Sequence, residues 1–183
     1  MFCAHLAGKL PSDNGLPYRF SSHAMSKRYA FVLLAMLVVP VTVSAQDAQT
    51  GHWTLNQAKS QFKTSPAPKT QVVTIVPDGK DGVKVTADVV RASGAKAAFS
   101  YAGQYDGKEN PRTETGDGAV PGQTVTLKRI DNHTVERISY LKGKKLVIEK
   151  WEISRDGRTR TVTQSGVGTD GKPVDNVLVY EKQ

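Results

Sequence analysis

Few residues of this sequence stand in patterns that support catalysis or metal binding. Two of its four histidines, His52 and His133, fall in the strand-rich part of the chain, and neither has metal-ligand spacing from another histidine, cysteine or carboxylate pair. The sequence holds no Gly-x-Ser-x-Gly nucleophile motif, phosphate-binding loop or His-Glu-x-x-His helix. Glu114 and Asp117 could act as acids, but no base, nucleophile and orienting group can be assembled around them. We therefore predict no enzyme, no metal site and no cofactor.

Aromatic side chains are better candidates for binding. Phe99, Tyr101 and Tyr105 share one face of a strand because their spacing is even, and Leu178 shares a face of the last strand with Tyr180. Plain core packing remains the alternative, because lining and core positions coincide in a small β-domain. The predicted ligand contacts are Phe99, Tyr101, Tyr105, Trp151, Leu178 and Tyr180.

Asp-Gly pairs divide residues 51–183 into short segments. Both residue types tolerate the positive φ angles of tight turns, so such a pair between apolar runs predicts a hairpin. Val83 to Val89 and Thr124 to Lys128 place apolar side chains at every second residue, which is the period of a half-buried strand. The pairs are Asp78-Gly79, Asp81-Gly82, Asp106-Gly107, Asp117-Gly118, Asp156-Gly157 and Asp170-Gly171.

Regularly spaced strands with short connections predict an all-β fold, an antiparallel up-and-down β-barrel of about 8 to 10 strands. One short helical segment is expected near the N-terminal end of the domain, over Asn56 to Phe62, because good helix formers there precede Pro66 and Pro68. A further strand forms if Arg112 to Glu114 pairs. The other predicted strands are Gly51 to Leu55, Gln71 to Val76, Val83 to Val90, Ala97 to Tyr105, Gln123 to Ile130, His133 to Leu141, Lys145 to Ile153, Arg158 to Gly166 and Asn176 to Glu181.

Residues 25–45 have the order of a secretory signal peptide. A cationic start is followed by the apolar run Tyr29 to Val39 and by small residues before a cleavage point at Gln46. The run is shorter than the about 20 residues of a transmembrane helix, so we expect no stable membrane insertion after cleavage. Residues 1–24 fit no part of such a signal and are expected to be a mis-assigned upstream segment, with a long leader as the alternative. The barrel domain is then 46–183, periplasmic or secreted.

The net charge of the chain is +8, and it falls to +5 without residues 1–45, which hold four basic residues and one acidic residue. Basic residues are dispersed along the predicted domain instead of forming one run. This spread favours a solvated surface over a nucleic-acid interface. We expect a monomer, and a small apolar molecule as the partner.

Both ends of the predicted domain carry familiar motifs. Gly51-His52-Trp53-Thr54-Leu55 resembles the opening G-x-W-x-L of lipocalin-like and fatty-acid-binding-protein-like small β-barrels, and Val177 to Lys182 resembles their closing strand. Val125 to Val135 and Asp170 to Val174 are similar to secreted bacterial proteins of that type. The resemblance spans Gly51 to Gln183, and it implies an up-and-down barrel whose lumen holds one apolar or amphipathic molecule.

Two positions depart from the fatty-acid-binding pattern. That family holds the ligand carboxylate with an arginine two residues before the tyrosine of the last strand, where this chain has Leu178, and with a second inward arginine, which aligns with Trp151. We therefore expect an apolar interior, in which a fatty-acid carboxylate would lack a paired cation. The charges of Glu149, Lys150, Glu152, Arg158 and Arg160 are expected to pair across strands on a solvated face.

These observations favour an exported binding protein for a small apolar ligand in a barrel lumen. Two other functions stay open. One is a structural or interaction domain with a packed core and no ligand, and the other is an enzyme that uses Glu114 or Asp117.

Overall fold

The computed structural model of this protein describes residues 47–183. The predicted upstream segment over 1–24 and the predicted signal peptide over 25–45 lie outside the described residues. In the described part of the chain, no helix has the length and apolar character needed to cross a membrane.

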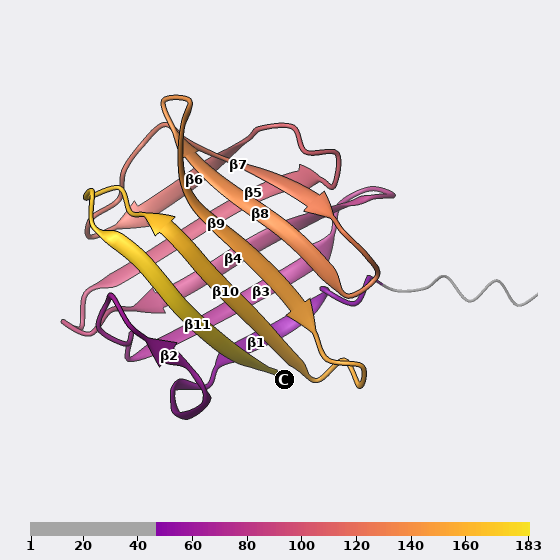
Figure 1. Ribbon diagram of the computed structural model, residues 1–183, viewed down its shortest axis with the longest axis horizontal. Helices are drawn as coiled ribbons and strands as arrows, with labels where there is room; N and C mark the ends of the chain where they lie inside the picture. Colours follow the sequence, from indigo (N-terminus) through magenta and orange to yellow (C-terminus); the bar gives the residue numbers. More distant parts are fainter. Residues whose placement is uncertain (1–46) are drawn as a thin grey trace, which may run out of the picture. The chain divides into compact units, whose positions relative to one another are not determined.

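The described chain forms an antiparallel up-and-down barrel of ten strands, which confirms the predicted fold class (Figure 1). Consecutive strands pair from β3 to β11, and β1 closes the barrel by pairing with both β3 and β11. The additional strand β2 pairs only with β11, at Asn176 and Val177. The strands are β1 Gly51–Leu55, β2 Gln61–Phe62, β3 Thr70–Pro77, β4 Gly82–Val90, β5 Lys96–Gln104, β6 Asn110–Gly116, β7 Gln123–Arg129, β8 Thr134–Leu141, β9 Lys144–Ile153, β10 Thr159–Val167 and β11 Pro173–Lys182.

The predicted short helical segment over Asn56 to Phe62 is present as a single turn. It contains one 3-10 turn, η1 Gln57–Lys59, followed directly by β2. Asn56 caps the turn, since its side chain accepts a hydrogen bond from the Lys59 amide at 3.1 Å. The Ser60 amide and hydroxyl bond back to the turn, and the Ser60 hydroxyl accepts from the Val179 amide. These contacts tie the segment to β11.

Asp-Gly pairs join consecutive strands at the predicted places. Asp106, Asp156 and Asp170 each accept a hydrogen bond, at 3.0 to 3.1 Å, from the amide two residues later. The pair Asp81-Gly82 differs, because Gly82 is the first residue of β4. The β8–β9 hairpin uses Lys142 and Gly143 instead, both with positive φ (51° and 75°), as a two-residue turn requires.

The pairing of β6 with β7 is much shorter than any other junction of consecutive barrel strands. Asn110 pairs with Val125 and Pro111 with Thr124, and the ladder ends there. Beyond Pro111, β6 continues to pair with β5 as far as Gly116. The wall between β6 and β7 is therefore joined by backbone bonds at one end only.

One end of the barrel is filled by a packed apolar core. Trp53 is fully buried, and its indole Nε1 donates to the Gln49 carbonyl oxygen at 3.0 Å. Apolar residues of neighbouring strands pack around it, among them Ile75, Val83, Leu127 and Val135. The tryptophan of the opening motif is therefore part of the core.

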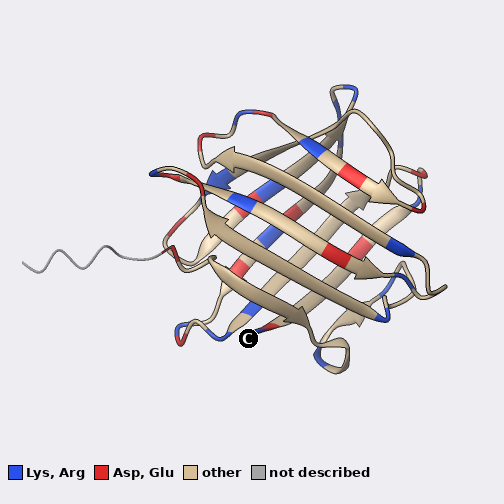
Figure 2. Ribbon diagram, turned by 180° about the vertical axis from the view of Figure 1, so that it is seen from behind, with Lys and Arg blue, Asp and Glu red and all other residues tan. Residues whose placement is uncertain are grey.

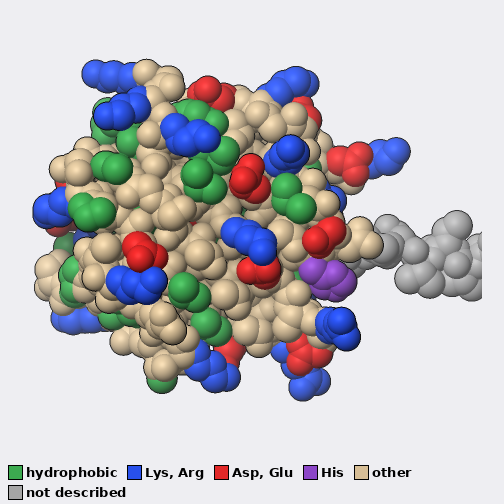
Figure 3. All heavy atoms as spheres, in the orientation of Figure 1, with side chains coloured by type: hydrophobic (Ala, Val, Ile, Leu, Met, Phe, Trp, Pro, Cys, Tyr) green, Lys and Arg blue, Asp and Glu red, His purple; other side chains and the backbone are tan. Residues whose placement is uncertain are grey.

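Charged residues lie on strands as well as in turns, as Figure 2 shows from behind. On the face in Figure 3, basic and acidic side chains are interspersed, without one large patch of either sign. Lys150 and Glu152, on the exposed face of β9, form one such ion pair at 2.7 Å. Several charged residues, however, point into the barrel.

Candidate functional site

The barrel interior contains a partly open cavity of about 360 Å³ beyond the apolar core. On β8, for example, Val135 belongs to the core, whereas the next two inward residues, Arg137 and Ser139, line the cavity. Every barrel strand from β3 to β11 contributes a lining residue. The charged lining residues are Arg91, Arg112, Glu114, Arg137, Glu149 and Arg160.

Alternation along the strands brings these charges inward. On β10, Arg160, Val162 and Gln164 share the inner face, and on β9 Glu149 and Trp151 do so. The strand pairing then determines which inward side chains lie next to each other. Arg137 pairs with Glu149 across β8 and β9, and Arg160 pairs with Tyr180 across β10 and β11.

The first ionic centre of the cavity is the pair Arg137 and Glu149. Arg137 Nη1 lies 2.6 Å from Glu149 Oε2, and the carboxylate also accepts from Trp151 Nε1 at 2.8 Å and from Gln164 Nε2 at 2.9 Å. Burial alone would raise the pKa of Glu149, but Arg137 and the two hydrogen bonds hold it at about 2. Burial alone would likewise lower the pKa of Arg137, but the carboxylate keeps it above its usual value. This pair is charged at all physiological pH values.

The second centre is a lone arginine. Arg160 is 3% exposed, and its guanidinium lies 4.2 Å from the ring centroid of Trp151 and 5.6 Å from that of Tyr180. Among the described residues it has no hydrogen-bond acceptor and no carboxylate within ion-pair distance. Burial lowers its pKa. The aromatic rings therefore provide its main stabilising contacts.

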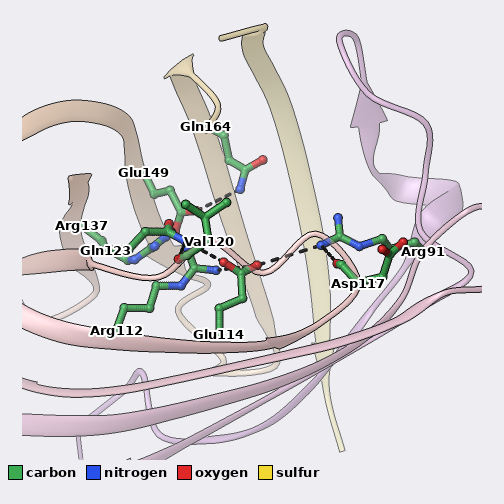
Figure 4. A network of polar contacts seen from close by, with 9 residues as sticks. All are labelled: Arg91, Arg112, Glu114, Asp117, Val120, Gln123, Arg137, Glu149 and Gln164. Atoms are coloured by element: carbon green, nitrogen blue, oxygen red, sulfur yellow. Dashed lines mark hydrogen bonds and ion pairs between the residues drawn. The ribbon is translucent and has the colours of Figure 1, made fainter. Parts of the chain in front are cut away.

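A third set of polar residues lies beside the β6–β7 junction (Figure 4). Arg112 Nη1 donates to Gln123 Oε1 at 2.9 Å, and its Nη2 lies 3.7 Å from Glu114. Gln123 Nε2 donates to Glu114 at 2.6 Å and to the Val120 carbonyl oxygen at 3.0 Å. Side chains thus span the part of the wall where the backbone ladder is missing.

The same set extends to the β4–β5 turn. Arg91 Nη2 donates to the Asp117 carbonyl oxygen at 3.0 Å and lies 4.0 Å from Glu114, so one carboxylate serves two arginines (Figure 4). Arg112 also lies over the ring of Phe99, at 4.4 Å from its centroid. Burial, together with the charge of Arg137, lowers the pKa of Arg112.

Four of the six predicted ligand contacts line the cavity: Phe99, Tyr101, Trp151 and Tyr180. Leu178 is buried and belongs to the apolar core cluster, but it does not line the cavity. Tyr105 lies outside it as well. β5 ends at Gln104, and the Tyr105 hydroxyl donates to Asp47 at 2.7 Å beneath the guanidinium of Arg129, away from the cavity.

The expectation of an apolar interior is wrong. Leu178 and Trp151 are apolar at the two anchor positions, but the adjoining strands supply inward arginines beside them, Arg160 and Arg137. The expectation that Glu149 and Arg160 lie on a solvated face is also wrong, since both are buried. The alternation of side chains along the strand could have predicted the inward position of Arg160, because Arg160 stands two residues before Val162 and therefore shares its face.

The remaining candidates for chemistry are dispersed. His52 lies on the exterior, with Nδ1 3.0 Å from the Thr74 hydroxyl, and the His133 amide donates to Asp131 in a turn. Over residues 47–183 no group of three or more histidine, cysteine or carboxylate side chains could hold a metal ion. Glu114 lines the cavity, whereas Asp117 contacts Arg91 through its backbone carbonyl oxygen.

Comparison with known proteins does not assign the chain to a family. No protein-family model matches the chain, and no curated protein matches it in sequence. The barrel is compatible with the lipocalin-like and fatty-acid-binding-like architecture, and this compatibility concerns the fold alone.

Proposed function

We propose that the barrel is a non-catalytic binding protein that holds a small polar molecule in its cavity. The carrying observation is a cavity of about 360 Å³ whose wall includes Arg137, Glu149 and Arg160, each at least nine-tenths buried. Sites for small molecules typically measure about 300 to 1,000 Å³. Burying a charge costs several kcal/mol, and apolar packing is often at least as stable, so folding alone gives no reason for such a wall.

The chemistry of the wall argues against the apolar ligand expected from the sequence. An apolar molecule would cover guanidinium and carboxylate groups without replacing their hydration, which is unfavourable. Apolar side chains such as Val73, Val85 and Val162 line part of the cavity and can contact the body of a ligand. A small molecule with polar groups at its ends fits this division better.

Binding without catalysis is supported by the state of the acidic groups. Glu149 stays ionised because its pKa is about 2, so it cannot exchange a proton near neutral pH. Burial raises the pKa of both Tyr101 and Tyr180, so these hydroxyl groups stay protonated near neutral pH. No histidine or cysteine lines the cavity in the described part of the chain. We include export in the proposal on the basis of the signal-like order of residues 25–45.

Native mass spectrometry of protein purified from the bacterial envelope tests this function directly. We expect a retained mass of a few hundred daltons that is released on denaturation. Val162→Phe should abolish it, because the added ring occupies the cavity. The matched control is Val76→Phe on the outer face of β3, where the same ring meets solvent.

Stability distinguishes a cavity from a packed interior. Overpacking costs about 1 to 3 kcal/mol where no space exists, so near-neutral unfolding of Val162→Phe supports the cavity. A parent protein without bound mass, combined with strong destabilisation by Val162→Phe, would refute the proposal and favour the packed structural domain.

A further inference from the structure

The cavity contains more cationic than anionic groups. Its lining includes four arginines and two glutamates, a net formal charge of +2. The pairing is also uneven. Arg137 has a close carboxylate partner at 2.6 Å, whereas Arg112 and Arg91 share Glu114 at 3.7 and 4.0 Å, and Arg160 has none among the described residues.

The cavity also provides too few hydrogen-bond acceptors for its arginines. The Nε atoms of all four cavity arginines are buried and have no hydrogen-bond partner among the described residues. A guanidinium offers hydrogen-bond donors and no acceptor. Each of these Nε–H groups therefore needs an acceptor that the surrounding side chains do not provide. Water can accept these bonds, but it leaves the excess positive charge in place.

Two positions in the cavity carry this deficit. Arg160 is the deeper one, held between Trp151 and Tyr180 without a counter-charge. Arg112 is the second, since the carboxylate that neutralises it is also approached by Arg91 and accepts from Gln123. Bidentate carboxylates match the planar fork of an arginine, so acidic groups are the natural complement of both positions.

We propose that the cavity selects small molecules with two acidic groups, one bound by the lone Arg160 and the other by Arg112 near the β6–β7 junction. This inference rests on the proposed binding function and adds the ligand class to it. A dianion cancels the net charge of +2 that the lining carries. The two carboxylates of the ligand supply the acceptors that the arginines lack, and a compact body lies against the valines of the wall.

A charge series on one scaffold tests the inference without any substitution. Benzene-1,3-dicarboxylate, its monomethyl ester and its dimethyl ester share a ring and differ by one negative charge at each step. Titration calorimetry should show the dicarboxylate binding at least tenfold more tightly than the monoester, and the monoester at least tenfold more tightly than the diester. Trp151, which lines the cavity, should report the same order by its fluorescence.

Arginine variants assign the two groups. Arg160→Met and Arg112→Met should each reduce dicarboxylate affinity at least tenfold and leave diester affinity unchanged, because only the charged contact is lost. The matched control is Arg129→Met, since Arg129 also lies over an aromatic ring, that of Tyr105 at 4.1 Å, but lies outside the cavity. Circular dichroism of each variant verifies folding. If a variant does not fold, the titration of the unsubstituted protein with the three probes decides the test.

The outcomes separate this inference from the binding function. Equal affinity for the three probes, or preference for the diester, overturns the dianion class while leaving a small-molecule cavity intact. Absence of binding by all three at millimolar concentration also overturns it, and the native mass spectrum then decides separately whether the cavity holds another molecule.

Discussion

Three of the four arginines that line the cavity lie over an aromatic ring. Arg112 lies over Phe99, Arg137 over Tyr101 and Arg160 over Trp151, at 4.2 to 5.3 Å from the ring centroids. Cation–π contacts of this kind are worth about 2 kcal/mol when desolvated. That is less than the several kcal/mol that burial of an unpaired ion costs, so an arginine without a carboxylate reduces stability.

Opposite effects are expected from two matched substitutions. Arg160→Met removes an unpaired buried charge and should leave the free energy of unfolding unchanged or raise it by about 1 kcal/mol. Arg137→Met leaves Glu149 charged and uncompensated, and should lower it by about 3 to 5 kcal/mol. Urea unfolding at neutral pH measures both. A strong loss of stability in Arg160→Met would mean that its ring contacts outweigh its desolvation.

Acid should unfold the barrel partly through Glu149. The pKa of this carboxyl is about 2 in the folded state against an ordinary value of 4.5, so its contribution is fully present above pH 4.5 and is lost as the pH falls toward 2. The shift corresponds to roughly 3 kcal/mol. Urea unfolding between pH 2 and 7 should show this loss, and Glu149→Gln should flatten the slope. An unchanged slope in the variant would assign the acid sensitivity to other carboxyls.

At the scale of single elements, turn chemistry and alternation predicted most of the strands, whereas β2 was missed. Asp-Gly pairs marked five inter-strand turns, and β4 and β7 were visible from their period of two. β6 was harder to predict because the proline is the one apolar side chain in Asn110–Gly116. Its strand character comes from its ladder with β5, which is a tertiary interaction and leaves no local pattern.

Gly116 at the end of β6 should be intolerant of a side chain. Its φ is +91°, and a Cβ there would collide with the backbone carbonyl oxygen of Lys96. Gly116→Ala should therefore lower the free energy of unfolding by at least about 3 kcal/mol, combining backbone strain with displacement of β5. Gly143→Ala is the control, because its φ of +75° is also unfavourable but open space surrounds it. Its cost should be about 1 to 2 kcal/mol. Equal thermal shifts would show that β5 yields easily.

For the whole molecule, the sequence predicted closure but not the character of the interior. Outer and inner faces of β10 both mix polar and apolar properties, with Thr159, Thr161 and Thr163 outside and Arg160, Val162 and Gln164 inside. Binary patterning assumes apolar residues inside, and it fails where a protein keeps a polar cavity. Four aromatic residues of the cavity lining were therefore among the predicted contacts, whereas Tyr105 lies elsewhere and the charged lining was missed.

Whole-barrel stability should depend on the apolar end of the molecule. Trp53→Ala should lower the free energy of unfolding by about 3 to 5 kcal/mol, because its fully buried ring leaves a large void. Domains of this size are stable by about 5 to 15 kcal/mol, so the variant should melt far below the parent in calorimetry. Phe62→Ala is the control, because this half-buried aromatic packs against the core from the additional strand β2, and the variant should melt closer to the parent. Equal melting of both variants would place the stabilising core elsewhere.

The short β6–β7 ladder has a consequence for solvent exchange. Beyond Pro111 the wall is held by side chains of Arg112, Glu114 and Gln123 instead of backbone bonds, and separating them breaks no ladder. Local opening there requires less free energy than global unfolding, whereas the β10–β11 ladder opens only with the whole barrel. Amide deuteration should therefore proceed first at those amides of residues 113–122 that are not bonded to β5, and last along β10 and β11. A bound molecule that engages Arg112 should slow the first of these rates and leave the second unchanged.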